Sequence, residues 1–254
     1  VWVAGSHTAR PLFSDLLRSV SEVEGIRRVR YTSPHPKDLR PETITAMAEV
    51  AEICEHLHLP LQSGSDEVLS AMHRGYTADR YLAKVHAARL EIVDLALSTD
   101  IIVGFPGESD SDFEKTLEVA AEARFDNAYT FVYSPRPGTQ AAELVDKYVA
   151  SSVASTRMER LRKVIERSSR LGNESRIGHS EEVIVEGRSK RDPNMLTGRT
   201  RHNRLIHFPA NRPIRAGSYA QVNVTAARTF NLMGELVEVT ASPKHRTRIP
   251  VVAS

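Results

Sequence analysis

Two segments decide the fold: LHLPLQSGSDE at residues 57–67 and STDIIVGFPGE at residues 98–108. Each is an apolar strand that runs into a turn rich in Gly and Ser and then into the start of a helix. In a parallel α/β sheet such turns lie at the carboxyl ends of the strands, where ligands bind. Free backbone N–H groups at the helix starts suit phosphate or carboxylate groups, and glycine lets a ligand approach closely. The two segments therefore predict a ligand-binding edge.

Helices and strands alternate on either side of these segments. This alternation predicts βα units and a parallel sheet over roughly the first 148 residues, followed by a linking helix over 149–176. Apolar spacing places helices at about 12–23, 41–53, 77–92, 109–123 and 149–171, and strands at about 28–33, 56–61, 95–103 and 128–133.

The pattern changes after residue 177, where short apolar runs alternate with Gly, Pro and Asn. Five short strands in this region predict a small all-β barrel over 177–240. We expect a disordered tail over 241–254. The runs are EEVIVEG, MLTGRTR, RLIHFPA, YAQVNVTAA and LMGELVEV.

Charge is distributed unevenly along the chain. The whole chain has 34 Lys and Arg against 32 Asp and Glu, a net charge of +2. From residue 177 onward there are twelve Lys and Arg against six acids, so the rest holds 22 against 26. A basic region on an acidic body indicates a nucleic-acid-binding module. A solvated basic surface is the alternative.

Composition excludes several classes of protein. With 41% hydrophobic residues the chain can bury a core. Its one cysteine, Cys54, excludes an intramolecular disulfide framework and fits a cytoplasmic protein. No apolar run approaches the roughly 18 residues of a membrane span, so we expect no membrane partner.

Cys54, His56 and His58 have the residue types of a metal site but not the geometry. A strand rises about 3.3 Å per residue, so the outer two side chains start about 13 Å apart. Zinc needs its donors about 2.0–2.3 Å from one ion, so three in a line cannot converge. We predict no metal site here, and expect a buried cysteine beside two histidines that share one face of the strand.

Several motifs resemble those of the radical-SAM methylthiotransferases. These enzymes use S-adenosylmethionine (SAM) and iron–sulfur clusters to add a methylthio group to tRNA or to a ribosomal protein. The last motif is most similar to the tRNA-modifying branch. In chain order they are TSPHP (32–36), PLQSGSD (60–66), M-x-R-x-Y-T (72–77), STDIIVGFPGE (98–108), YSPRPGT (133–139) and SKRDPNMLTGRTRHNRLIHF (189–208).

The resemblance implies a partial β/α, TIM-like barrel followed by an OB-like TRAM barrel that binds RNA. It also implies SAM and 4Fe–4S clusters, held in the family by a C-x-x-x-C-x-x-C loop and three further cysteines. This chain has one cysteine and begins at Val1. We therefore expect an N-terminally truncated member that has no catalytic residue or metal ligand of its own and is inactive alone.

The implied reaction is 2-methylthiolation of an isopentenyladenosine next to the anticodon. By the family mechanism, a reduced cluster cleaves SAM to a 5′-deoxyadenosyl radical, and a second cluster supplies the methylated sulfur. The implied partner is the anticodon stem-loop of tRNA, and the full-length form is expected to be a monomer. A non-catalytic RNA-binding remnant and a ribosomal-protein methylthiotransferase remain open, although TSPHP and LTGRTR favour tRNA.

SAM candidates lie at the strand ends. Gln62, Ser63 and Ser65 end the first strand, although the two serines could merely cap the next helix. The resemblance places the end of the next strand and the end of the strand at 128–133 beside the adenine. The cofactor candidates are Gln62, Ser63, Ser65, Asp100, Ile102, Gly104, Tyr133 and Ser134.

Substrate candidates are His35, which two prolines hold at the same edge, and Arg74 and Arg136, which could bind a carboxylate or phosphate. The alternatives are turn rigidity for the histidine and ordinary surface charge for the arginines.

RNA candidates are basic residues of the β region. Arg199 and Arg201 are predicted on one face of a strand, where they suit phosphates, and Phe208 or Tyr219 could stack on an unpaired base. The set is Lys190, Arg191, Arg199, Arg201 and Arg204.

Overall fold

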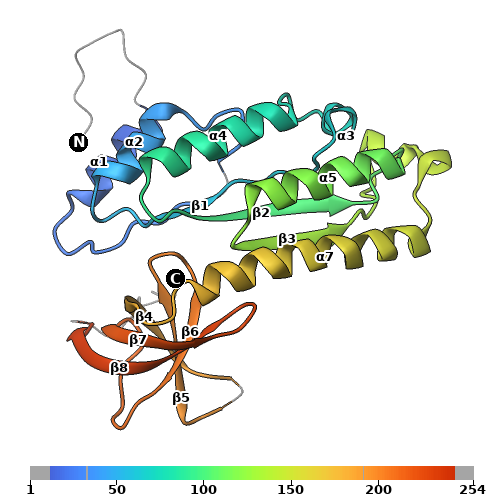
Figure 1. The fold of residues 1–254 in the computed structure, drawn as a ribbon. Coiled ribbons are helices and arrows are strands. Elements are labelled where there is room, and N and C mark those ends of the chain that lie inside the picture. Colours follow the sequence, from blue (N-terminus) through green and yellow to red (C-terminus); the bar gives the residue numbers. More distant parts are fainter. Residues whose placement is uncertain (1–11, 33, 191, 244–254) are drawn as a thin grey trace, which may run out of the picture. The chain divides into compact units, whose positions relative to one another are not determined.

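The computed structural model describes residues 12–32, 34–190 and 192–243 (Figure 1). The chain divides into two compact units, Val1–Arg162 and Lys163–Ser254. The division falls within a long helix, α7 (Ser151–Glu174), which contributes residues to both units. Throughout the described ranges, no helix is both long and apolar enough to cross a membrane.

The first unit contains a parallel sheet of three strands in the order β1-β2-β3. These are β1 (His56–His58), β2 (Ala96–Val103) and β3 (Asn127–Val132). The parallel arrangement brings their carboxyl ends to one edge, as the sequence predicted. The first strand is shorter than expected, but a further parallel bridge joins Gln62 to Ile101.

Helices α4 (Ala78–Glu91) and α5 (Asp110–Ala123) lie along one face of this sheet (Figure 1). Alternation along β1 and the residue after it directs the apolar side chains of Leu57 and Leu59 to that face, and both are fully buried. The short helix α3 (Asp66–Ala71) lies between β1 and α4 in the chain. The opposite face, which carries His56 and His58, is therefore the one available to a ligand.

The segment before β1 contains less strand than the sequence predicted. It has two helices, α1 (Phe13–Ser21) and α2 (Pro41–Glu49). The strand expected over 28–33 is reduced to one parallel bridge between Val29 and Ile53, and Ser33 lies outside the described residues. The following prolines, which lack N–H donors, cannot extend a ladder.

The segment between β3 and the second unit is helical. A short helix α6 (Gln140–Glu143) and a 3₁₀ turn η1 (Val145–Lys147) precede α7. The linking helix predicted over 149–176 is α7, which passes through Gly172 and ends at Glu174. The side-chain amide of Asn173 donates to the carbonyl oxygens of Arg228 and Thr229 at 2.8 and 2.9 Å, which anchors the last turn.

The second unit is a closed five-stranded barrel in the order β4-β5-β6-β8-β7, which confirms the predicted small all-β barrel. Its core is formed by alternating apolar side chains, among them Val183, Ile206 and Phe208. Gly198 is required for close packing, because a Cβ there would lie 2.2 Å from a methyl group of Val183. The strands are β4 (Ser180–Arg188), β5 (Met195–Thr200), β6 (Leu205–Pro209), β7 (Tyr219–Ala227) and β8 (Leu232–Ala241).

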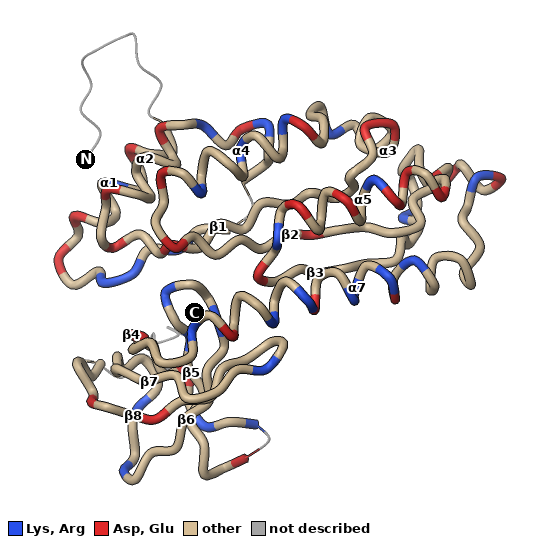
Figure 2. Tube along the Cα trace, viewed as in Figure 1, with Lys and Arg blue, Asp and Glu red and all other residues tan. Residues whose placement is uncertain are grey.

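The strand directions divide the connections of this barrel between its two ends. Strand β4 is antiparallel to β5 and β7, and β5 is antiparallel to β6. The connections 189–194 and 210–218 therefore share one end, the loop end. The connections 201–204 and 228–231 share the other, the turn end. Figure 2 marks the Lys and Arg positions along both units.

Candidate functional site

A cavity of about 650 Å³ lies where the three parallel strands end. This volume is within the usual range for sites that bind cofactors, roughly 300–1,000 Å³. Strand residues line it together with the helices and loops that follow them. The lining residues are Gln62, Ala71, Met72, His73, Arg74, Asp100, Ile102, Phe105, Phe131, Val132, Tyr133, Ser134, Arg136, Thr139, Gln140 and Ala141.

A polar network runs along the ligand side of the sheet toward this cavity. Nε2 of His56 and Nδ1 of His58 lie 3.0 and 2.8 Å from the Ser98 hydroxyl oxygen. Nε2 of His58 lies 3.4 Å from a carboxylate oxygen of Asp100. One hydroxyl donates one proton, so a consistent arrangement has His56 donating to Ser98, Ser98 to His58 and His58 to Asp100. The network therefore orients the Asp100 carboxylate.

The histidines share one face of the strand, as the sequence predicted. Both side chains are buried, and Cys54 is buried beside them in the chain. Among the residues that the structure describes, no group of three or more His, Cys, Asp or Glu is arranged to hold a metal ion.

Gln62 and Gly104 are turn residues with left-handed backbone conformations. Gln62 has φ of +67° and donates its backbone N–H to the carbonyl oxygen of Asp100 at 2.8 Å. A non-glycine residue in this region is strained, and such strain is concentrated at functional sites. Gly104 has φ of +77° and does not line the cavity, although Ile102 does. Its role here is to turn the chain at the end of β2.

A buried ion pair, which the sequence did not reveal, holds the turn after β2. The Arg157 guanidinium on α7 donates to the Glu108 carboxylate at 2.7 Å and to its backbone oxygen at 3.1 Å. The same carboxylate accepts the backbone N–H of Gly104 at 2.8 Å. Burial raises the pKa of Glu108, although the Gly104 N–H group and the Arg157 charge oppose that effect. These bonds position the cavity residue Phe105.

The two serine candidates face α5 and do not line the cavity. Ser63 and Ser65 are fully buried. The Ser63 hydroxyl lies 3.3 Å from that of Thr116, and Ser65 donates to Asp112 at 2.7 Å. Ser65 is also the N-cap of α3. Ser65 therefore has the helix-capping role that was the alternative to cofactor binding. Gly64, between the two serines, is required because a Cβ there would lie 2.6 Å from the backbone of α5.

Aromatic and basic side chains complete the cavity. Phe131 is 52% exposed on β3, and the rings of Phe105 and Tyr133 meet edge to face with centroids 5.4 Å apart. Arg74 and Arg136 line the same cavity, and neither guanidinium has an ion-pair partner among the described residues. The structure thus brings together Gln62, Asp100, Ile102, Tyr133 and Ser134 with both arginines.

His35 lies close to the cavity lining but outside it. Its ring meets that of Tyr76 edge to face at 5.4 Å, and the Tyr76 hydroxyl donates to the carbonyl oxygens of Pro60 and Leu61. Burial lowers the pKa of His35, and the positive charge of Arg74 lowers it further. The histidine therefore favours its neutral form beside a cationic edge of the site.

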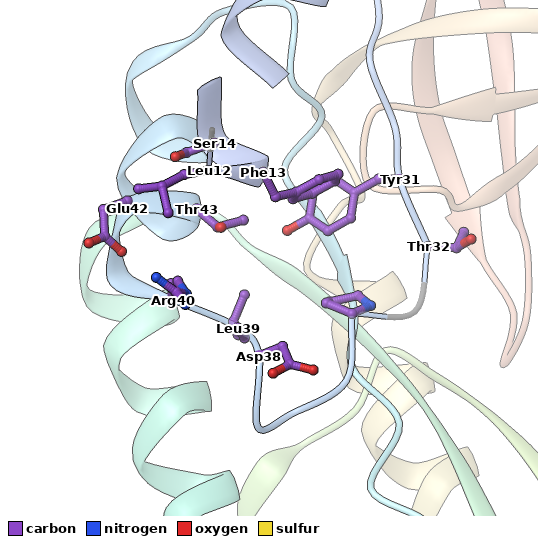
Figure 3. Close-up of a pocket in the computed structure, with 11 residues that line it drawn as sticks. Leu12, Phe13, Ser14, Tyr31, Thr32, Asp38, Leu39, Arg40, Glu42 and Thr43 are labelled. Atoms are coloured by element: carbon purple, nitrogen blue, oxygen red, sulfur yellow. The ribbon is translucent and has the colours of Figure 1, made fainter. Parts of the chain in front are cut away.

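A second cavity, of about 750 Å³, lies beside α1 and the start of α2 (Figure 3). Phe13 and Tyr31 form its aromatic side, with ring centroids 4.9 Å apart. Asp38, Arg40 and Glu42 bring mixed charge to its lining. It is larger than the first cavity, but no end of the three-stranded sheet opens into it, so we place the candidate cofactor site in the first cavity.

The predicted RNA-binding arginines are engaged within the barrel. Arg199 donates to Glu186 and to the carbonyl oxygen of Asn203, both at 3.1 Å, and Arg204 donates to Asn173 at 2.7 Å. Strand β5 ends at Thr200, so the placement of Arg201 on a strand was wrong, and it lies in the following turn.

The remaining RNA candidates differ in exposure. Lys190 is exposed, whereas Arg191 lies outside the described residues. Tyr219 is half-buried at the start of β7. The expectation that Phe208 stacks on a base was wrong, because its side chain is fully buried in the barrel core.

Comparison with known proteins matches both units to families. Residues 1–120 match the radical SAM superfamily, and residues 174–237 match the TRAM domain. Coproporphyrinogen III oxidase from Escherichia coli, a radical SAM enzyme, is a weak structural likeness. Its TM-score is 0.47 and its identity 14%, covering 76% of this chain and 46% of that chain.

Several relatives bear one name, tRNA-2-methylthio-N(6)-dimethylallyladenosine synthase. That of Moorella thermoacetica is 45% identical, covering 89% of this chain and 50% of that protein. That of Carboxydothermus hydrogenoformans is 44% identical, covering 90% and 51%. Synthase 1 of Mycobacterium marinum is 45% identical, covering 89% and 44%. The chain thus spans about half the length of the curated relatives it matches, and it resembles them over a segment that matches the radical SAM superfamily followed by a segment that matches the TRAM domain.

Proposed function

We propose that this chain is part of a tRNA methylthiotransferase that modifies carbon 2 of an isopentenyladenosine next to the anticodon. The observation that carries the proposal is the cavity at the ends of β1–β3, found in a chain 45% identical to a named tRNA-2-methylthio synthase. The TRAM barrel would bind the anticodon stem-loop. Because tRNA is the substrate, we place the protein in the cytoplasm.

The cavity residues fit SAM. A carboxylate accepts hydrogen bonds from hydroxyl or ammonium groups, so Asp100 would bind such a group of the cofactor. Arg74 and Arg136 would bind its carboxylate as bidentate donors. Phe131 and Tyr133 offer aromatic surface for the adenine. When bound, SAM supplies a 5′-deoxyadenosyl group and a methyl group, and these residues bind and orient it.

Iron–sulfur clusters do not fit the residues of this chain. Such clusters are held by several cysteine thiolates. Cys54 is the one cysteine in the sequence, and it is buried and does not line the cavity. The contribution of this chain is therefore to bind SAM and tRNA.

Deletion of the gene in its source organism tests the proposal. The nucleosides of total tRNA would be separated and identified by mass spectrometry. We expect the 2-methylthio derivative of isopentenyladenosine to disappear and the unmodified isopentenyladenosine to accumulate. An unchanged tRNA profile together with a ribosomal protein that loses a methylthio group would instead support the protein-modifying branch.

A further inference from the structure

The Lys and Arg side chains of the barrel differ in whether they already bind a partner within the protein. At the turn end, Arg199 and Arg204 hold partners within the barrel, and Arg201 is also engaged. Beside them, Arg176 forms a buried ion pair with Glu181 at 2.5 Å. A guanidinium that is committed to a protein partner must give up that partner to bind a phosphate.

The loop end carries cationic side chains that are exposed and are not committed to a partner within the described part of the protein. Four exposed side chains there have no hydrogen-bond or ion-pair partner in the part of the chain that the structure describes. The nearby acids are Asp192, which accepts the backbone N–H of Asn194 at 2.9 Å, Glu238 on β8, and Glu186 on β4, which is paired with Arg199 at 3.1 Å. The described charge at this end is therefore positive. The four cations are Arg188, Lys190, Arg212 and Arg215.

The loop that carries two of these arginines is fixed to the barrel. Ala210 and Ile214 pack against the barrel core. The backbone N–H of Gly217 donates to the carbonyl oxygen of Val185 at 2.8 Å, and the N–H of Val185 donates back to Ser218 at 2.8 Å. These bonds join the loop 210–218 to β4 three residues before Arg188. The four cations are therefore presented together by one anchored end of the barrel.

We propose that the loop end of the barrel, with Arg188, Lys190, Arg212 and Arg215, is the surface that contacts the tRNA phosphates. This inference rests on the proposed function, since it takes tRNA as the ligand. Unpaired exposed cations bind phosphates and release the counterions of the nucleic acid, a contribution that does not depend on sequence. The arginines of the turn end then have a structural role in the barrel.

The test measures the affinity of the 254-residue chain for tRNA over a range of salt concentrations. Log affinity falls linearly with log salt concentration, and each lost phosphate contact reduces the magnitude of this negative slope by about 0.7 to 1. We expect Arg212→Gln/Arg215→Gln to reduce the magnitude of the slope by about 1.4 to 2, and to weaken binding equally for tRNAs of different sequence. Both side chains are exposed, so circular dichroism should show an unchanged fold.

Arg228→Gln is the matched control, because Arg228 is an exposed arginine of the turn end with no side-chain partner among the described residues. We expect its slope to equal that of the wild type. A double variant with the wild-type slope, or an Arg228→Gln variant with the larger loss, overturns the inference alone. A wild-type chain that does not bind tRNA overturns the proposed function and this inference together.

Discussion

Replacing Arg157 by Met should destabilise the first unit strongly, because it leaves a buried carboxylate without its cation. The Glu108 side chain is fully buried, and that of Arg157 is 7% exposed. Removing one partner of a buried pair costs about 3–5 kcal/mol. The second partner of Arg157, Asp110, is 91% exposed and should add little. We therefore expect a loss of about 3 kcal/mol in the free energy of unfolding.

The double variant Glu108→Gln/Arg157→Met separates this cause from lost packing. It removes both charges and leaves an amide that can still accept the Gly104 N–H group. Residues in direct contact couple by about 0.5–3 kcal/mol, so the double variant should lose less stability than the sum of the two single losses, by at least about 0.5 kcal/mol. If the two single losses add instead, the buried charge is not the cause.

The stability cost of Arg157→Met should depend on pH, and the pKa of Glu108 decides the sign of that dependence. Burial raises the pKa of Glu108, and loss of the Arg157 charge must raise it further. When folding raises the pKa of a carboxyl group, the free energy of unfolding of the protein decreases as pH increases through that raised pKa. The cost of Arg157→Met should therefore be smaller at pH 5 than at pH 8.

Hydrogen-exchange mass spectrometry with increasing urea measures the local free energy of unfolding. Peptides of β2 and α5 report on the first unit, and peptides of the barrel strands provide an internal reference. A loss below about 1 kcal/mol in β2 and α5, or a cost that grows as pH falls, would refute the reasoning.

Three further predictions concern the cavity and the barrel. Asp100→Asn removes a charged acceptor and should weaken SAM binding about tenfold in calorimetry; an affinity within about twofold would contradict its role. Burial tends to raise the pKa of Glu181, but the neighbouring His202 ring, whose Nδ1 lies 3.8 Å from the carboxylate, and the charge of Arg176 lower it overall. Barrel stability should thus fall as pH drops below about 4.5 through the lowered pKa, and Glu181→Gln should flatten that dependence in acid unfolding. Phe208→Ala should lower the free energy of unfolding, measured in urea, by about 3–5 kcal/mol. A much smaller loss would mean that the ring is not part of the core and would favour the predicted stacking on an RNA base.

The architecture could be predicted because local patterns carry it. Alternating helices and strands require a parallel sheet, and the two Gly- and Ser-rich turns then share one edge. The burial of Phe208 was also available from the sequence. Ile206 and Phe208 occupy alternate positions of β6, which places two apolar side chains on the core face.

Contacts between distant residues could not be predicted from local patterns. Arg157 and Glu108 are 49 positions apart and meet because α7 returns to the turn after β2. For the same reason, the sequence identified the basic character of the barrel but not which arginines are engaged. Ser65 fitted both a cofactor ligand and a helix cap, and only its contact with Asp112 shows which way it faces.

The most direct test of the account is a crystal structure of the chain soaked with S-adenosylhomocysteine. We predict ligand density in the cavity at the ends of β1–β3, in contact with Asp100, Phe131 and Tyr133. Density in the cavity beside α1 and α2, or no binding at saturating concentration, would contradict the assignment of the cofactor site.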